Sequence, residues 1–376
     1  MANPTKLLRE LIALPSVNPA FLPAGDPHAG EQRVADFLTA AAARLGLAVE
    51  LQKVFPGRHN VLARLLPAGP IRQRIVLAPH MDTVGAASDE QFTPVLRNGR
   101  LYGRGTCDTN GCVAAMLAAV AAIAGRKVRP RITEILFAAL IDEENAQCGS
   151  HALAESGFTA DLAIVGEPTR LKVITAHKGD LWLRFETRGR AAHGATPHLG
   201  RNAVHEMARV VDLIETEYAA QLRRRRHPLL GTGTISVGAM HGGVQANIVP
   251  DRCEMVADRR TLPGETEASV RREIARLLRR HGLKARLADS KGNPCFPLET
   301  NPRLPLVRRL MRAARQRAPQ GVHFFCDASV LGRAGIPSVV FGPGDIAQAH
   351  TADEWISVRE LERGTALLTE FLAGLP

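Results

Sequence analysis

The sequence predicts an α/β protein, in which a large domain with helices on both faces of its sheet carries a smaller inserted α+β unit. Two observations support this fold class. Four apolar runs lack the alternation of a half-exposed strand and are typical of strands covered on both faces: residues 75–78, 132–141, 162–165 and 338–341. Between about residues 179 and 287, the chain changes to a strand–helix–strand–strand–helix–strand order.

Helices are predicted between the apolar runs. Apolar residues recur at helical spacing in residues 5–14 and 30–45, and Gly46 is a natural stop after the second segment. Residues 112–124 form the clearest buried helix. The longest apolar stretch, residues 113–124, falls short of the roughly 18 residues that a membrane-spanning helix needs. We therefore expect no association with the membrane.

The inserted unit is predicted to be an antiparallel sheet covered by two helices. Its expected strands are residues 180–188, 233–240, 248–258 and 283–287, and its expected helices are residues 202–217 and 265–281. The apolar run near residue 340 returns to the pattern of the first part of the chain. We therefore predict a discontinuous large domain, residues 1–178 and 289–376, with residues 179–288 inserted.

Composition excludes several classes of protein. The chain has 45% hydrophobic residues and a net charge of +11, from 48 Lys+Arg and 37 Asp+Glu, which excludes intrinsic disorder. The basic clusters at residues 223–226 and 271–280 are not interleaved with aromatic residues, so a solvated basic face is favoured over a nucleic-acid site. We expect no nucleic-acid partner. The rival hypothesis predicts binding that weakens steeply with salt.

The N-terminal segment and the cysteines indicate a cytoplasmic protein. Residues 1–18 lack a basic segment followed by a clean apolar stretch, so a signal peptide is not predicted. The six cysteines form no C-x-x-C pair, which argues against a disulfide framework or a thiolate zinc site. Cys107 and Cys112 are expected to be packing residues.

Polar residues follow the apolar runs at the points where strands should end. In an open α/β sheet the ligand site lies outside the carboxyl ends of the strands, so these residues are candidates for a site. They are His80 and Asp82, the acidic run Asp142-Glu143-Glu144, Glu167, and His350 beyond the turn at residues 342–344, together with Asp108 before the helix at residues 112–124.

These side chains would converge at one edge of the sheet. So many carboxylates would repel one another strongly, and a divalent cation would resolve that conflict. The donors are nitrogen and oxygen without thiolate, which suits zinc, cobalt or manganese. The number of carboxylates favours two ions that share a bridging Asp.

Five ordered segments of the chain resemble the M20 metallopeptidase family. They are PHMDTV at 79–84, GRGTCD at 103–108, DEE at 142–144, GEPT at 166–169 and GPGDIAQAHTADE at 342–354. The most similar branch contains the acetylornithine deacetylases and succinyl-diaminopimelate desuccinylases. The resemblance implies a zinc-peptidase-like catalytic domain with a mixed sheet. The chain departs from the family after Asp108, with TNGC where MKGG is usual, but no ligand position is lost.

The resemblance implies two metal ions with one shared ligand. His80, Asp108 and Glu167 would hold one ion, and Asp108, Glu144 and His350 would hold the other. Zinc is the expected metal, with cobalt or manganese as alternatives.

The resemblance also assigns catalytic roles. Asp82 would orient His80, and Glu143 would be the general base for a metal-activated water that attacks an amide carbonyl. His193, in the segment 189–198, matches a histidine that stabilises the developing oxyanion, commonly in the partner subunit.

Substrate binding and assembly complete what the resemblance implies. Asn247 and Arg260 match positions that bind the substrate carboxylate, a task suited to a planar guanidinium. Gly342 and Gly344 would supply backbone donors nearby. The inserted unit matches the family's lid and dimerisation domain, so a homodimer through residues 179–288 is expected.

The function predicted from these residues is hydrolysis of the amide bond of an N-acyl amino acid, of the deacetylase or desuccinylase type, within arginine or lysine biosynthesis. A dipeptidase or carboxypeptidase of the same family is one alternative. A non-catalytic binding protein on the same fold is another, and the intact Glu143 and ligand set argue against it.

Overall fold

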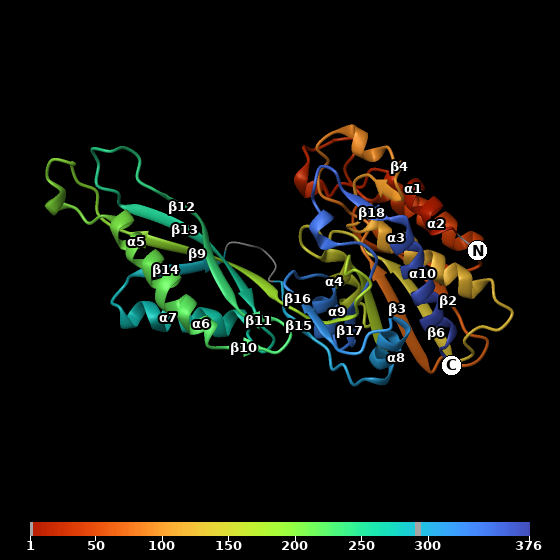
Figure 1. Cartoon of the computed structure of the whole chain (residues 1–376). Helices are drawn as coiled ribbons and strands as arrows, with labels where there is room; N and C mark the ends of the chain where they lie inside the picture. The colour runs from red at the N-terminus through yellow and green to blue at the C-terminus, as the bar shows by residue number, and fades with distance from the viewer. Residues whose placement is uncertain (1–2, 290–294) are drawn as a thin grey trace. The chain divides into compact units, whose positions relative to one another are not determined.

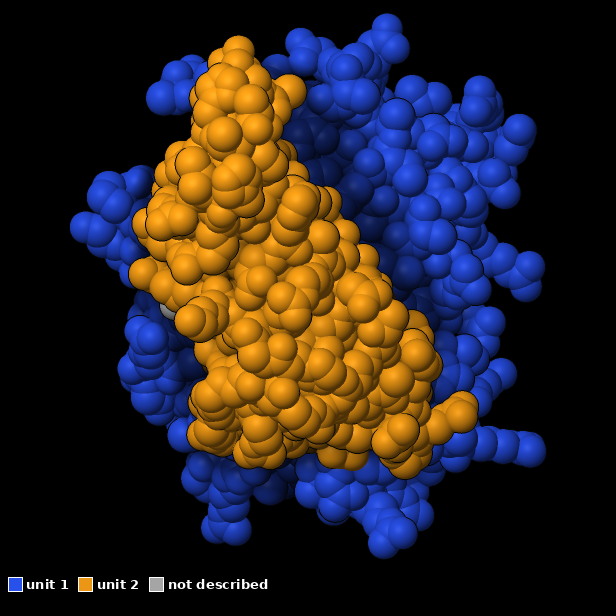
Figure 2. All heavy atoms as spheres, turned by 90° about the vertical axis from the view of Figure 1, so that its left-hand side faces the viewer, with its two compact units in different colours: residues 1–175, 300–320, 326–376 blue, residues 176–299, 321–325 orange. Residues whose placement is uncertain are grey.

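The computed structural model describes residues 3–289 and 295–376, and the chain divides into two compact units (Figure 2). Unit 1 comprises residues 1–175, 300–320 and 326–376, and unit 2 comprises residues 176–299 and 321–325. The predicted junction at 178/179 lies three residues after the bound at 175/176. The predicted junction at 288/289 lies eleven residues before the bound at 299/300 and adjoins residues 290–294, which lie outside the described residues. Residues 321–325 also belong to unit 2, whereas the prediction assigns them to the large domain.

Unit 1 is built on a mixed sheet. Strand β3 pairs in parallel with β6 and with β7, and β7 pairs in parallel with β17, whereas β1/β2, β2/β6 and β17/β8 are antiparallel. The order is β1 (Ala48–Phe55), β2 (Arg58–Leu65), β6 (Thr133–Ala139), β3 (Gln73–Pro79), β7 (Leu162–Gly166), β17 (Ser338–Val340) and β8 (Ile174–His177). All residues of β6 and β7 are buried, as expected for strands covered on both faces.

Helices cover both faces of this sheet. One apolar cluster joins the sheet to α1 (Pro4–Ile12), α2 (Gln32–Arg44), α3 (Asn110–Ala124), α8 (Pro305–Ala313) and α10 (Val358–Ala373). Helices α1, α3 and α10 lie side by side (Figure 1), and α3 is buried along nearly its whole length. Helices α4 (Cys148–Glu155) and α9 (Ala328–Arg333) contact each other and pack on β1 and on β7 and β17, respectively.

A small second sheet lies in the same unit. It contains β4 (Val95–Arg97), β5 (Arg100–Tyr102) and β18 (Trp355–Ser357), and Trp355 pairs with Tyr102 in antiparallel register. Short 3₁₀ turns occupy Pro19–Phe21, Asp89–Phe92 and Ile346–Gln348. The β5–β18 pairing brings the segment before α3 beside the segment that follows His350.

Unit 2 has the predicted order of strands and helices. Its antiparallel sheet runs β12 (Thr234–Gly242), β13 (Arg252–Thr261), β9 (Gly179–Arg188) and β14 (Ala285–Asp289). Apolar residues of α5 (Ala203–Leu213) and α7 (Glu267–Arg280) join the sheet in one core. Helix α5 continues through a π turn at Ile214–Tyr218 into α6 (Ala219–Arg223), past the predicted end of the helix.

The remaining strands of unit 2 are short. Strand β10 (Arg226–His227) pairs with β11 (Gly231–Thr232). Strand β15 (Leu298–Glu299) pairs with the end of β8. Strand β16 (Gln320–Val322) also pairs with β8 and begins in unit 1. The predicted strand at 248–258 begins only at Arg252, because residues 243–251 form a loop that contains Gly243 with φ 79°. Among the described residues, no helix is both long and apolar enough to cross a bilayer.

Candidate metal centre

The candidate ligands lie at the ends of strands of unit 1. His80 follows β3, Glu144 lies beyond the end of β6, and Glu167 follows β7 directly. Asp108 lies in the loop before α3, and His350 ends the loop that follows β17. Parallel strands end at one edge of a sheet, so β3, β6 and β7 deliver their ligands to the same place.

The first group consists of His80, Asp108 and Glu167, whose ligand atoms all lie within 4.8 Å of one another. His80 Nε2 is 3.2 Å from Asp108 Oδ1 and 3.8 Å from Glu167 Oε1. The side chains are 1%, 9% and 5% exposed, respectively. We call this group the inner triad.

The second group consists of Asp108, Glu144 and His350, also within 4.8 Å of one another. His350 Nε2 is 3.4 Å from Asp108 Oδ2 and 3.2 Å from Glu144 Oε2. The His350 side chain is 55% exposed, in contrast to the other ligands. We call this group the outer triad. Asp108 faces His80 with one carboxylate oxygen and His350 with the other, which is the geometry of a bridging ligand.

The donor set fits divalent cations. Glu144 Oε1 and Glu167 Oε1 are buried and have no hydrogen-bond partner. Burying an unpaired carboxylate oxygen is costly, and a cation would supply the missing partner. Two imidazoles and three carboxylates without a thiolate suit zinc, cobalt or manganese.

The pKa values of the candidate ligands reflect the closeness of several buried carboxylates. Burial, reinforced by the negative charge of Asp108, raises the pKa of Glu167 well above its ordinary value and that of Glu144 to about 7. Burial opposes ionisation of Asp108, but its hydrogen bonds to His350 and His80 outweigh burial and hold its pKa below its ordinary value. Hydrogen bonds to Asp108 and Glu144 raise the pKa of His350 to about 10. A cation at these groups would therefore displace protons on binding.

Asp82 fixes the orientation of His80. His80 Nδ1 donates to the Asp82 carbonyl oxygen at 2.9 Å and lies 3.4 Å from Asp82 Oδ1. A proton on Nδ1 leaves the lone pair of Nε2 directed at the inner triad. The Asp82 carboxylate also accepts from the backbone N–H groups of Glu143 and Glu144, both at 3.1 Å. Asp82 therefore connects His80 to the acidic segment after β6.

A further set of buried polar residues supports Asp82. Asn18 Nδ2 donates to Asp82 Oδ2 at 2.7 Å and to Asp142 Oδ1 at 3.0 Å, so one amide separates two carboxylates. Arg58 pairs bidentately with Glu31 at 2.6 and 2.7 Å and reaches Asp142 at 3.2 Å. Sequence reasoning missed Asn18, Glu31 and Arg58, because none of them follows a predicted strand at the site edge.

Glu143 lies beside the inner triad but belongs to neither triad. Its Oε2 is 4.0 Å from His80 Nε2, and its side chain is 11% exposed. Burial raises the pKa of Glu143 well above its ordinary value, and the negative charges of Glu167 and Asp327 act in the same direction. Glu143 is therefore more basic than a solvent-exposed glutamate, as a general base requires.

Asp327 is a fourth residue that sequence reasoning missed. It precedes α9, and its Oδ1 accepts from Ser150 Oγ at 2.6 Å and from Gln147 Nε2 at 3.3 Å. Burial raises its pKa to about 6. These bonds fasten the segment that follows Glu144. The acid at position 327 follows only a three-residue apolar stretch, residues 324–326, which is not predicted as a strand, so the strand-end pattern does not find it.

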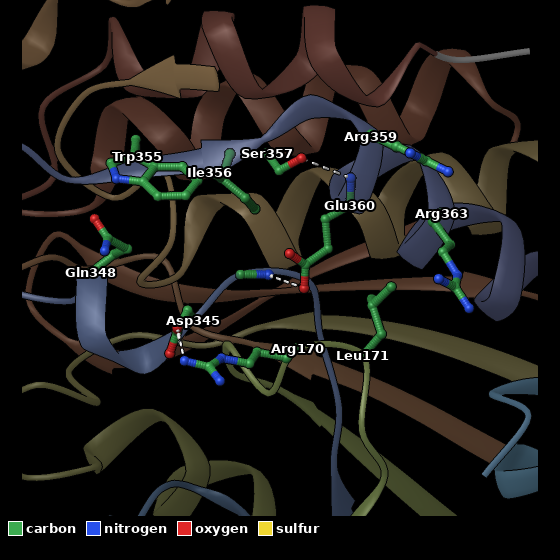
Figure 3. A pocket seen from close by; sticks show the side chains of 11 residues that line it. Arg170, Leu171, Asp345, Gln348, Trp355, Ile356, Ser357, Arg359, Glu360 and Arg363 are labelled. Carbon is green, nitrogen blue, oxygen red and sulfur yellow. Dashed lines mark hydrogen bonds and ion pairs between the residues drawn. The ribbon is translucent and has the colours of Figure 1, made fainter. Parts of the chain in front are cut away.

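Hydrogen bonds tie the loop that leads to His350 to the neighbouring segments. Gly342 N–H donates to Thr169 Oγ1 at 3.1 Å, and Gly344 N–H donates to Glu360 Oε1 at 3.3 Å. Arg170 and Asp345 point toward each other and form an ion pair beside a surface pocket of about 410 Å³ (Figure 3).

Only glycine fits at position 342. A Cβ there would overlap with Cys112 Sγ. The role of Gly342 and Gly344 as substrate donors stays a prediction, with both N–H groups engaged within the protein.

His193, Asn247 and Arg260 lie in unit 2. His193 is exposed, and its Nδ1 accepts from the Ala195 N–H at 3.1 Å. Asn247 is exposed in the loop after β12, and its carbonyl accepts from the Gly194 N–H at 2.7 Å.

Arg260 is engaged within its own unit. It forms two hydrogen bonds of 2.9 Å to Asp258 and lies over the Phe325 ring. The predicted oxyanion and substrate roles of His193, Asn247 and Arg260 stay predictions.

The six cysteines are free thiols, and Cys107 and Cys112 are buried. Burial raises the pKa of both thiols, and neighbouring carboxylates add to the effect. Neither residue belongs to a triad. Both thiols are buried beneath the loops of the site, and their role as packing residues stays a prediction.

Comparisons with known proteins identify the family. A sequence profile of Peptidase family M20/M25/M40 matches residues 76–374. The chain is 31% identical over 376 residues to an acetylornithine deacetylase of Edwardsiella ictaluri (strain 93-146), covering 97% of this chain and 96% of that protein. It is also 31% identical over 360 residues to an acetylornithine deacetylase of Myxococcus xanthus, covering 90% of each. The chain therefore belongs to peptidase family M20/M25/M40 and is a hydrolase, as its motifs predicted.

Solved structures show the same fold. Aminopeptidase PepT from Bacillus cereus ATCC 10987 matches with a TM-score of 0.79 and 23% identity, over 99% of this chain and 97% of that chain. A dinuclear metal binding peptidase of the M20 family from Bacillus subtilis matches with a TM-score of 0.71 and 12% identity, over 98% and 96%. These likenesses concern the fold, and the predicted fold class is confirmed.

Proposed function

We propose that the chain is a dinuclear metal-dependent hydrolase that removes the acyl group from an N-acyl amino acid, in the manner of an acetylornithine deacetylase. His80, Asp108 and Glu167 would hold one divalent ion, and Asp108, Glu144 and His350 the other. Zinc is the expected metal. The similarity to curated acetylornithine deacetylases supports the reaction class.

The observation that carries the proposal is the shared position of Asp108. Its two carboxylate oxygens face two separate histidines, each of which has its own glutamate at the site. A single ion would leave one of these groups without a partner. Two ions would use every buried carboxylate oxygen that lacks a hydrogen bond in the two triads.

Two ions at this site would lower the pKa of a water molecule and polarise the amide carbonyl of the substrate. The protein residues would then move the proton. Glu143 lies beside the inner triad without belonging to it, so its carboxylate is free to accept a proton from the attacking water. It would pass that proton to the leaving nitrogen. Asp82 would keep His80 in the orientation that leaves Nε2 free.

The finer assignments belong to the same proposal. Arg260 and Asn247 would bind the substrate carboxylate, and His193 would stabilise the oxyanion. The protein would act in the cytoplasm as a homodimer through residues 179–288, within arginine or lysine biosynthesis.

Turnover of a substrate panel tests the proposal. Purified protein would be assayed on N-acetyl and N-succinyl amino acids and on dipeptides, after chelation and after addition of zinc, cobalt or manganese. We expect chelation to abolish deacylation and added metal to restore it. Faster turnover of dipeptides than of N-acyl amino acids would show that the protein is a dipeptidase and not a deacylase. Bound metal with no turnover of either substrate class would contradict the proposed activity.

A further inference from the structure

Glu354 is a buried carboxylate with an unusual number of donors. Its side chain is 0% exposed. Oε1 accepts from the backbone N–H groups of Cys107 at 2.8 Å and Asp108 at 3.0 Å. Oε2 accepts from the Gly105 N–H at 2.9 Å and from Arg104 Nη1 at 2.7 Å. All four donors lie within one loop, which ends at Asp108.

The position of Glu354 follows from strand pairing. Trp355 of β18 pairs with Tyr102 of β5, so the residue before one strand lies opposite the residue after the other. The backbone N–H of Gly103 accordingly donates to the Glu354 carbonyl oxygen at 3.1 Å. The register of a two-strand contact thus brings Glu354 to a loop that lies about 250 residues earlier in the chain.

The loop at residues 103–108 needs such an acceptor. It is buried and irregular, with positive φ at Gly103 and Gly105. The N–H groups of Gly105, Cys107 and Asp108 donate to the Glu354 carboxylate rather than to a backbone carbonyl. A buried N–H without an acceptor destabilises the folded state. The Glu354 carboxylate accepts hydrogen bonds from three of these N–H groups. It therefore stabilises the loop conformation in which all three N–H groups point toward it. That conformation also fixes the direction of the Asp108 side chain.

We propose that Glu354 is a positioning residue for the shared ligand Asp108, and that it thereby sets the affinity of both metal positions together. This inference deepens the proposed function and rests on it. Asp108 contributes an oxygen to each triad, so a shift of the loop disturbs both. His350 lies only four residues before Glu354, so one segment supplies a ligand of the outer triad and the support of the bridging ligand.

The substitution Glu354→Gln isolates this role. Glutamine keeps the size of the side chain but has one oxygen in place of two and presents an N–H to donors that need an acceptor. Partners that orient a metal ligand typically change affinity by about 10–100-fold when they are replaced. We expect both stepwise zinc affinities to fall by about this factor, and in parallel.

Glu134→Gln is the matched control. Glu134 is also a buried carboxylate, bound to Arg64 at 3.1 Å and Arg74 at 2.7 Å. It lies at the start of β6, whereas the acidic segment of the site lies beyond the end of that strand. This variant should lower thermal stability and leave both metal affinities unchanged.

Calorimetric titration of the full chain with zinc, together with the melting temperature before metal addition, tests the inference. Parallel loss at both positions in Glu354→Gln, without loss in Glu134→Gln, would support it. Unchanged affinities with a lower melting temperature would show a purely structural role and overturn it. Loss at one position alone would also overturn it.

A second variant keeps the test decisive. If Glu354→Gln does not fold, Glu354→Asp retains the charge but is one methylene shorter, and it should lower both affinities by a smaller, equal factor. Unchanged affinities in this variant would overturn the inference. Failure of the unaltered chain to bind zinc would instead overturn the proposed metal centre, and the inference with it.

Discussion

The inner and outer triads share Asp108 but differ in how the protein holds their other ligands. In the inner triad, His80 and Glu167 directly follow two buried neighbouring strands, and Asp82 fixes the His80 ring. In the outer triad, Glu144 lies on an irregular segment, and His350 ends a long loop with its side chain half exposed. Ligands on strands are positioned with less conformational freedom than ligands on loops.

The comparison predicts that the site combines a tight and an exchangeable metal position. Ordering a loop on metal binding costs conformational entropy that a preformed position does not pay. We therefore expect the inner triad to bind its ion more tightly than the outer triad, and the outer ion to leave first.

The largest expected effect comes from Asp108→Asn, which alters both triads at once. The amide lacks the negative charge that bridges the two positions. Each ion contributes several kcal/mol to transition-state stabilisation, so loss of both should lower kcat/KM by about 10⁴-fold or more. Elemental analysis should find both ions depleted. Retention of two ions with normal turnover would refute the bridging role of Asp108.

Glu143→Gln should separate proton transfer from metal binding. Because Glu143 lies in neither triad, both ions should remain, whereas loss of a general base should lower kcat by about 10²–10³-fold. Metal content and kcat are measured on the same preparation. Unchanged kcat at full metal content would show that Glu143 is not the base.

His350→Ala and His80→Ala distinguish the two positions directly. His350→Ala should lose the outer ion and keep the inner one. The affinity for the inner ion should change by less than about tenfold, because the inner triad keeps all of its own ligands and is perturbed only indirectly. His80→Ala should weaken the inner position. Zinc titrations of both variants would test the assignment. Equal loss of both ions in His350→Ala would contradict the expectation that the outer ion can be lost while the inner ion stays bound.

Asn18→Ala should have the smallest effect, and mainly on the inner triad. The substitution removes the amide that separates the Asp82 and Asp142 carboxylates. We expect the free energy of unfolding to fall by about 1–3 kcal/mol, because two buried acceptors lose a partner. The inner affinity should fall by about tenfold and the outer affinity less. Chemical denaturation measures the free energy of unfolding, and zinc titration measures the two affinities. An equal loss of zinc affinity at both triads would contradict the expected difference between them.

The strand-end pattern was informative because it depends on local sequence. Residues that directly follow buried apolar runs, such as His80 and Glu167, could be predicted as candidates, and the structure brings their ligand atoms together. The fold class and the family could be predicted for the same reason, since buried strands and ordered motifs are visible in the chain itself.

The supporting residues could not be predicted in this way. Asn18 contacts Asp82 from 64 residues earlier in the chain, and Glu354 reaches Asp108 across 246 residues. Their roles depend on the register of β5 and β18 and on how the N-terminal loop packs, which are tertiary features. Local patterns identify side chains that can bind a metal and a near neighbour such as Asp82, whereas distant supporting residues such as Asn18 and Glu354 are identified only in the folded structure.

The most direct test of the two-ion site is a crystal structure of the protein with zinc, using anomalous scattering at the zinc edge. The account predicts two anomalous peaks per chain, about 3.5–4 Å apart, both within bonding distance of Asp108, one beside His80 and Glu167 and the other beside Glu144 and His350. A single peak, or peaks that Asp108 does not bridge, would contradict it.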